Sequence, residues 1–121
     1  MASVEEYVLQ AKRKESIADY MARGGFYDWA ITALFYAALN LMQAYFLERQ
    51  VEATSHYERR VRILNDPGLR SISTPYNSLK IGSERSRYEC LLSNEREYRE
   101  ARDGPYAAVI QRIQSLRGTI T

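Results

Sequence analysis

Apolar residues recur at helical spacing over the first part of the chain. Between residues 3 and 23 they stand three or four positions apart, and charged residues fill much of the space between them. This spacing is typical of an amphipathic helix with one buried face. Gly24 and Gly25 follow, and two residues without a Cβ favour the end of a helix. The pattern therefore predicts a first helix over residues 3–23.

The most apolar part of the chain comes next. Of the 19 residues from 29 to 47, only Thr32, Asn40 and Gln43 are polar. A helix without a polar face is buried on several sides, and its amides need hydrogen-bond partners. Its length also approaches the roughly 20 residues that cross a bilayer. We favour a central bundle helix that also forms a dimer face over a membrane span, because one isolated span would leave the amphipathic segments unexplained.

A third helix is predicted from its cap and its terminator. Thr54 or Ser55 can cap the first turn, and the sequence Asp-Pro-Gly at residues 66–68 ends the helix. Its expected apolar face carries Tyr57, Val61 and Leu64. The arginines of this segment would then face elsewhere.

A fourth helix is predicted over residues 76–92. A polar loop at residues 71–74 leads to Pro75, which suits the first turn of a helix. The middle of this helix, residues 82–86, begins with small residues and is polar, whereas the buried face of a helix usually carries large apolar side chains. We therefore expect another backbone or a ligand to approach closely there. One line of the helix carries Tyr76, Leu79, Ser83 and Cys90, with Ile81, Tyr88 and Leu92 beside it.

The last helix is predicted from Ser93 or Asn94 to Arg117. Its in-phase apolar residues are interrupted by the pair Gly104-Pro105, where a kink or a break is expected because proline lacks the N–H donor. No alternation typical of a β-strand occurs. The sequence therefore predicts an all-α protein, a single domain over residues 1–121 that folds as a five-helix antiparallel up-and-down bundle.

Composition limits the chemistry. The chain has 121 residues with one Cys and one His, too few for an intrachain disulfide or a structural zinc site. No spacing typical of a serine hydrolase, a redox dithiol or a phosphate-binding loop is present. The first residues lack the features of a signal peptide. We therefore expect a cytoplasmic protein without metal or cofactor.

Charge is concentrated in the middle of the chain. Residues 56–88 hold seven Lys and Arg against three Asp and Glu, 7 − 3 = +4, which leaves 10 − 12 = −2 for the rest. An arginine-rich face beside tyrosine rings suits phosphate and stacked bases. A solvated face with ion pairs explains the same residues equally well. The third and fourth helices thus form a candidate nucleic-acid surface.

Single residues on this surface have alternative interpretations. His56 lies at a helix start, where the helix dipole disfavours its protonated form, so it could act as a general acid or base or merely pack at a corner. Tyr88 follows two arginines and could be held near a phosphate or be a core ring. The candidate binding residues are His56, Arg59, Arg60, Arg85, Arg87 and Tyr88.

The order of these features resembles the HEPN domain family of small helical bundles. The resemblance is carried by residues 23–30, residues 33–38, Ala44, the pair Ser55-His56, Leu79, residues 83–88, Glu97, Ala101 and Ile110. It implies a homodimeric or heteromeric bundle, often paired with a nucleotidyltransferase or a toxin–antitoxin partner, with nucleotide or RNA as the usual ligand. Many members are metal-independent ribonucleases with an Arg followed by a His after four to six residues.

The chain departs from that ribonuclease motif. No His follows Arg85 or Arg87, and His56 lies upstream in the third helix. The first hypothesis is therefore a non-catalytic dimer in which Arg59, Arg60, Arg85 and Arg87 meet phosphate while His56 and Tyr88 orient it. The second is a metal-independent endoribonuclease that uses His56. The third is a structural dimer or antitoxin without nucleic-acid contact.

Overall fold

The fold was analysed in a computed structural model that describes residues 2–89 and 92–118. Regular structure in these residues is entirely helical, which confirms the all-α prediction and gives a helical bundle. The elements are α1 (Val4–Arg23), α2 (Tyr27–Glu48), α3 (His56–Asn65), the 3₁₀ turn η1 (Arg70–Ile72), α4 (Ser73–Tyr88), α5 (Glu95–Ala101), the π-helical segment η2 (Arg102–Tyr106) and α6 (Ala107–Gly118).

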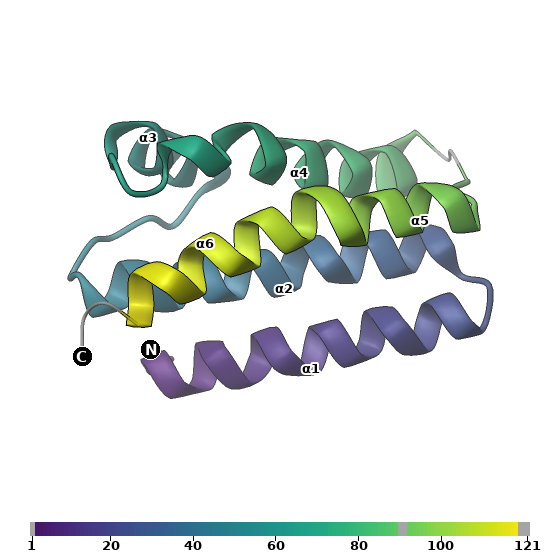
Figure 1. Ribbon diagram of the computed structural model, residues 1–121, viewed down its shortest axis with the longest axis horizontal. Helices are drawn as coiled ribbons and strands as arrows, with labels where there is room; N and C mark the ends of the chain where they lie inside the picture. The colour runs from purple at the N-terminus through teal and green to yellow at the C-terminus, as the bar shows by residue number, and fades with distance from the viewer. Residues whose placement is uncertain (1, 90–91, 119–121) are drawn as a thin grey trace.

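Helices α1 and α2 form an antiparallel hairpin along one side of the molecule (Figure 1). Ser3 and Glu6 form a capping box at the start of α1, with the Glu6 N–H donating to Ser3 Oγ over 3.1 Å. Gly24 closes α1 by donating to the carbonyl oxygens of Met21 and Tyr20. Gly25 then takes a φ of +85°, a backbone conformation that glycine tolerates best. The first predicted helix and its terminator are therefore confirmed.

Helix α2 is the centre of the core. Most of its residues are buried by α1 on one side and by α4, α5 and α6 on others. Ala18 of α1 and Ala38 of α2 are fully buried, and such small side chains let the two backbones pack closely. The largest buried side chains of α2 are Leu34, Phe35, Met42 and Tyr45.

The apolar character of α2 also satisfies the criteria for a membrane span. Among the described residues, α2 is the one helix long and apolar enough to cross a bilayer, with a mean hydropathy of 1.4. In this structure 78% of that stretch is buried by the rest of the chain, as in the core helix of a globular domain. The absence of a membrane and the cytoplasmic location remain predictions.

The two amides of α2 have partners within the chain, as their burial requires. Asn40 is 9% exposed, and its Oδ1 accepts a hydrogen bond of 2.6 Å from Lys14 Nζ of α1. Gln43 donates from Nε2 to the carbonyl oxygen of Ala53 over 2.8 Å. These bonds fix α2 against α1 and against the segment that enters α3.

Helix α3 begins as predicted but buries a different face. Ser55 caps it by accepting from the Glu58 N–H at 3.1 Å. The expected apolar face is wrong, because Tyr57 is 76% exposed and Leu64 is 43% exposed. The buried residues are Arg59 and Ile63, which lie four positions apart on one face. Arg59 can enter the interior because its guanidinium finds acceptors there.

Helix α4 starts earlier and ends earlier than predicted. Residues 70–72 form the 3₁₀ turn η1 in place of a polar loop, and Pro75 lies in the first turn of α4 as expected. Tyr76, Leu79 and Ser83 are buried on one line, as predicted, and Cys90 lies outside the described residues. The placement of Ile81, Tyr88 and Leu92 beside that core line is wrong, since all three are exposed: they lie on the far side of α4 or after its end.

The small middle of α4 accommodates a close neighbour. A Cβ on Gly82 would lie 3.2 Å from Ile31 Cγ2 of α2. Ser83 next to it is fully buried. A close approach does occur here, but the neighbour is a side chain of α2 and not the backbone or ligand that the sequence predicted.

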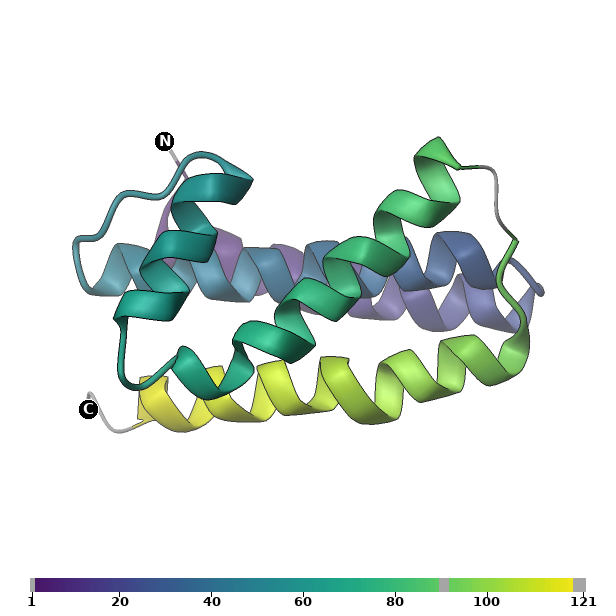
Figure 2. The same cartoon turned by 90° about the horizontal axis from the view of Figure 1, so that it is seen from above.

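The last helix accommodates its proline by widening. Helices α5 and α6 are joined through the π-helical segment η2, which contains Gly104 and Pro105 (Figure 2). A wider turn has room for a residue without an N–H donor, so the expected interruption takes the form of a π segment. Tyr98, Tyr106, Val109 and Ile113 are buried along this helix.

The arrangement of α3 and α4 positions the candidate site. The two helices meet at η1 and diverge from there over α2, so that the start of α3 and the end of α4 lie at opposite arms of a V (Figure 2). The first turn of α3 and the first half of α4 therefore share one face of the molecule.

Candidate functional site

A pocket of about 450 Å³ lies between α3 and the first half of α4. Two of the candidate binding residues, His56 and Arg60, line it together with Lys80 of α4. This volume lies within the roughly 300 to 1,000 Å³ of small-ligand sites in proteins. The full lining is His56, Tyr57, Arg60, Ile63, Leu64, Ser73, Thr74, Tyr76, Asn77 and Lys80.

Arg59 lies behind this pocket as a buried cation. It is 7% exposed, and its Nη2 lies 3.1 Å from His56 Nδ1 while Nη1 lies 3.5 Å from the Ala53 carbonyl oxygen. Its Nε has no hydrogen-bond partner, and no described carboxylate forms an ion pair with it. Burying a guanidinium without an anionic partner costs free energy of folding, so a negatively charged group next to Arg59 would stabilise the site.

Contact with Arg59 fixes the tautomer of His56. A guanidinium has only donors, so His56 Nδ1 must accept, and the imidazole proton resides on Nε2. Burial first, and then the positive charges of Arg59 and Lys80, lower the pKa of His56 below its usual value. The neutral imidazole expected from the helix start is therefore supported, with its Nε2–H available to an acceptor.

Tyr76 is a second buried polar residue beside Arg59. It lines the pocket and is 5% exposed, its ring packs 5.7 Å from that of Phe35, and its buried hydroxyl faces the Arg59 guanidinium. Burial raises the pKa of Tyr76 to about 12, with the charge of Arg59 opposing the shift. The phenol therefore stays protonated at neutral pH.

The pocket continues into a second group of cations on α4. Lys80 forms an ion pair of 2.7 Å with Glu84, and this bond lowers the pKa of Glu84. Arg87, one turn further on, donates from Nη1 to the Tyr36 hydroxyl over 2.6 Å and contributes to the lowered pKa of His56. Lys14 Nζ of α1 lies 5.8 Å from the centroid of the same Tyr36 ring.

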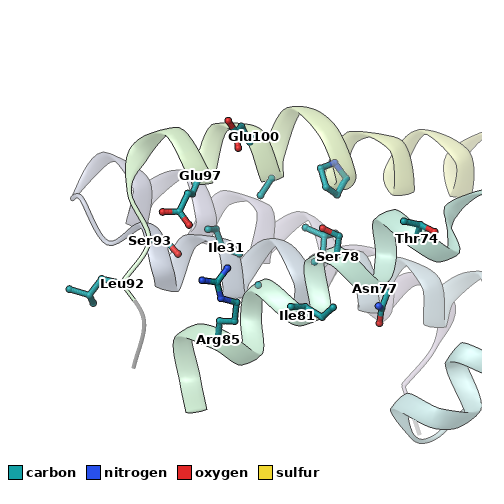
Figure 3. A pocket seen from close by; sticks show the side chains of 14 residues that line it. Ile31, Thr74, Asn77, Ser78, Ile81, Arg85, Leu92, Ser93, Glu97 and Glu100 are labelled. Carbon is teal, nitrogen blue, oxygen red and sulfur yellow. The ribbon is translucent and has the colours of Figure 1, made fainter. Parts of the chain in front are cut away.

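Arg85 lies in a different place from Arg87. The two residues are two positions apart, about 200° around a helix axis, so they face opposite sides of α4. Arg85 lines a second pocket of about 510 Å³ between α4 and α5, where it extends toward Ser93 and Glu97 (Figure 3). Glu97 and Glu100 line that pocket too, so its charge is mixed.

The six candidate residues thus fall into separate groups. His56, Arg59 and Arg60 come together at the α3–α4 pocket, and Arg87 lies beside it on the α2 side. Arg85 and Tyr88 are elsewhere. Tyr88 is 73% exposed, so the core interpretation of this ring is wrong, and the guanidinium carbon of Arg87 lies 5.0 Å from its centroid.

Tyr76 and Lys80 line the pocket but were not among the candidates. Tyr76 was assigned to the core from its spacing, and Lys80 was counted only as part of the charge. They lie four positions apart, so they share one face of α4. His56, Arg60 and Ile63 likewise have the spacing of one helical face, and this spacing is the signal that places them on the pocket side of α3.

Comparisons with known proteins add no relative. No family model, no curated protein and no solved structure matches the chain. The resemblance to the HEPN family therefore remains a prediction. Among residues 2–89 and 92–118, no three His, Cys, Asp or Glu side chains gather closely enough to hold a metal ion. That the protein needs no metal or cofactor also remains a prediction.

Proposed function

We propose that the protein is a non-catalytic HEPN-like module, a five-helix antiparallel up-and-down bundle, that binds RNA through the basic face of α3 and α4. The observation that carries this proposal is Arg59, a buried guanidinium that forms no ion pair with a carboxylate of residues 2–89 and 92–118 and lies beside an open pocket. A phosphate would supply the missing negative charge. A free nucleotide and a partner nucleotidyltransferase are the other ligands that the resemblance predicts.

The charges around the pocket support the same ligand class. Arg60 has no ion pair with a described carboxylate, and Lys80 pairs only with Glu84. The first turn of α3 adds the positive end of a helix dipole. Positive charge therefore exceeds negative charge at this face, and backbone phosphates are the part of RNA that such a face binds most strongly.

The state of His56 favours binding over cleavage. A general base needs a free lone pair, but Nδ1 accepts from Arg59 and Nε2 carries the proton. The imidazole is thus arranged as a donor toward an anion. Native protein incubated with RNA in EDTA should leave the RNA intact, whereas cleavage that disappears in His56→Ala would establish the endoribonuclease alternative.

A pair of arginines on α3 provides the central test. Arg60→Glu should weaken binding of a single-stranded RNA with a 5′-hydroxyl end by at least about tenfold, measured by fluorescence anisotropy at moderate salt. Arg62→Glu makes the same change of charge on the same helix but outside the pocket, and should change affinity by about twofold or less, because salt screens distant charges.

Two results would overturn the proposal. One is the absence of RNA binding by the native protein, which is the outcome that a structural dimer or antitoxin predicts. The other is an equal loss of RNA affinity in Arg60→Glu and Arg62→Glu, which would show that binding depends on the overall positive charge of α3 and not on the pocket. The proposed cytoplasmic homodimer is tested separately by sedimentation velocity over a range of concentrations.

A further inference from the structure

We infer that the pocket between α4 and α5 binds a free α-amino acid with a large apolar side chain, held by Arg85 and Glu97. This pocket of about 510 Å³ has the size of a small-ligand site. It shares Thr74 and Asn77 with the α3–α4 pocket but none of the charged residues. The inference therefore goes beyond the proposed function and does not depend on RNA binding.

The floor of this pocket is apolar. Ile31 of α2 and Leu79 of α4 line it and are 5% and 1% exposed, so they close the pocket against the core. Ala101 and Pro105 line the opposite wall, and Ile81 lies half-exposed on the α4 side. An apolar group that enters this space leaves water without losing a hydrogen bond, which favours binding. The body of the ligand is therefore apolar.

One end of the pocket carries two opposite charges. Arg85 reaches in from α4 and Glu97 from α5 (Figure 3), yet the ion pairs of the described residues do not include a bond between them. Arg85 pairs instead with Glu89 on its own helix, where Nε lies 4.0 Å from Oε2, a long contact between exposed side chains. The guanidinium is therefore available to bind the carboxylate of a ligand.

Glu97 is the carboxylate that would meet an ammonium group. Its Oε1 accepts a long hydrogen bond of 3.4 Å from the Asn94 N–H in the capping box of α5, and it forms no ion pair with a cation of residues 2–89 and 92–118. Glu100 also lines the pocket, but it is paired with Arg96 over 3.0 Å. The negative charge available to a ligand is therefore that of Glu97.

An α-amino acid has the chemistry that this arrangement fits. It carries an ammonium group and a carboxylate on one carbon, so one small head group can contact Arg85 and Glu97 together. Its side chain leaves the same carbon and can extend over the apolar floor. Within a peptide chain both groups are neutral amides, so a peptide segment would leave the two charges of the pocket without partners.

Isothermal titration of the full chain with four compounds separates the parts of the ligand. L-Phenylalanine should bind at least about tenfold more tightly than its N-acetyl form, its carboxamide or L-alanine, because each of these lacks one recognised group. Equal binding of the N-acetyl form would contradict the role of Glu97, and equal binding of the carboxamide that of Arg85. Equal binding of L-alanine would contradict the role of the apolar floor. Absence of L-phenylalanine binding would overturn the inference as a whole.

Two variants test the charged end. Arg85→Gln and Glu97→Gln should each lower the affinity for L-phenylalanine by about tenfold or more, because one charge of the ligand loses its partner. Glutamine also serves in a capping box, so Glu97→Gln should keep the native circular dichroism spectrum. Arg62→Gln and Glu95→Gln make the same charge changes at exposed positions outside the pocket and should bind as the native protein does. Native affinity in both pocket variants would overturn the inference.

A competition experiment separates this inference from the proposed function. Saturating L-phenylalanine should leave the affinity for RNA unchanged, because the charged residues of the two pockets are different. Displacement of one ligand by the other would show that Arg85 belongs to the RNA surface and would overturn the separate site. Binding of L-phenylalanine by a protein that binds no RNA would support this inference and remove the proposed function.

Discussion

The contact between Arg59 and His56 shows how one residue decides the chemistry of its neighbour. Arg59 is held inside the fold, and its Nη2 lies 3.1 Å from His56 Nδ1. The position of His56 at the start of α3 indicated a neutral imidazole, but only the contact decides which nitrogen carries the proton. The lone histidine of the chain is thereby a donor in the folded state.

This contact predicts a pH dependence of stability. The folded pKa of His56 lies below the ordinary value of 6.5, so the unfolded chain takes up a proton first as the pH falls. The free energy of unfolding should therefore decrease as the pH falls from about 6.5 through the lower folded pKa. His56→Asn keeps an acceptor for Arg59 but does not titrate, and its free energy of unfolding should decrease less over that range.

Urea unfolding at a series of pH values measures this difference. The contribution of His56 is fully present above the unfolded pKa, so the two proteins should differ least in pH dependence at neutral and alkaline pH. Parallel curves for the native protein and His56→Asn down to about pH 5 would contradict a lowered pKa.

At the scale of elements, capping residues and helix-breaking residues determined where the helices begin and end, and packing determined which face of each helix is buried. Helix α1 begins within one residue of its predicted start and stops at Gly24, and Ser55 is the one of the two predicted residues that caps α3. The buried side of α3 does not follow from hydrophobicity, because a face with Arg59 and Ile63 competes with a more apolar face that includes Tyr57. The face with Arg59 and Ile63 is buried because it lies against α4 and because acceptors for the Arg59 guanidinium are available there.

The turn between α1 and α2 provides a prediction about one such element. Gly25 has a φ of +85°, so Gly25→Ala should lower the free energy of unfolding by about 1 kcal/mol or more. Gly104→Ala is the matched control: its φ is not positive and an added Cβ would meet no atom within 4 Å, so its stability should be unchanged or slightly higher. Chemical denaturation measures the free energy of unfolding of both variants. Equal changes in the two variants would show that the positive φ at Gly25 does not require glycine.

At the scale of the whole molecule, the distribution of charge over the surface matters more for binding than the net charge does. The net charge is only +2, yet Arg60 and Lys80 line one pocket with Arg59 behind it, against Glu58 and Glu84 on the same two helices. Association with a polyanion depends on this local concentration, since salt screens charges that lie farther away than about 10 Å. The face made by α3 and α4 is therefore the part of the surface that determines binding.

A salt titration tests this distribution. If about three cations contact RNA phosphates, the logarithm of the binding constant should fall with the logarithm of salt concentration with a slope of about −2. Arg60→Ala should reduce the slope by about 0.7, since one fewer phosphate is neutralised, and Arg62→Ala should leave it unchanged. A slope near zero in the native protein would mean that backbone phosphates are not the ligand.

The sequence by itself determined the helices, because local spacing, caps and breakers act within a few residues of each other. It also placed the positive charge on α3 and α4. Only the tertiary structure decided that His56 and Arg60 share a pocket with Tyr76 and Lys80, with Arg59 buried behind it, while Arg85 faces another one. The physical reason is that the angle at which α3 and α4 diverge, and the side that each turns inward, depend on packing against α2, which no local pattern encodes.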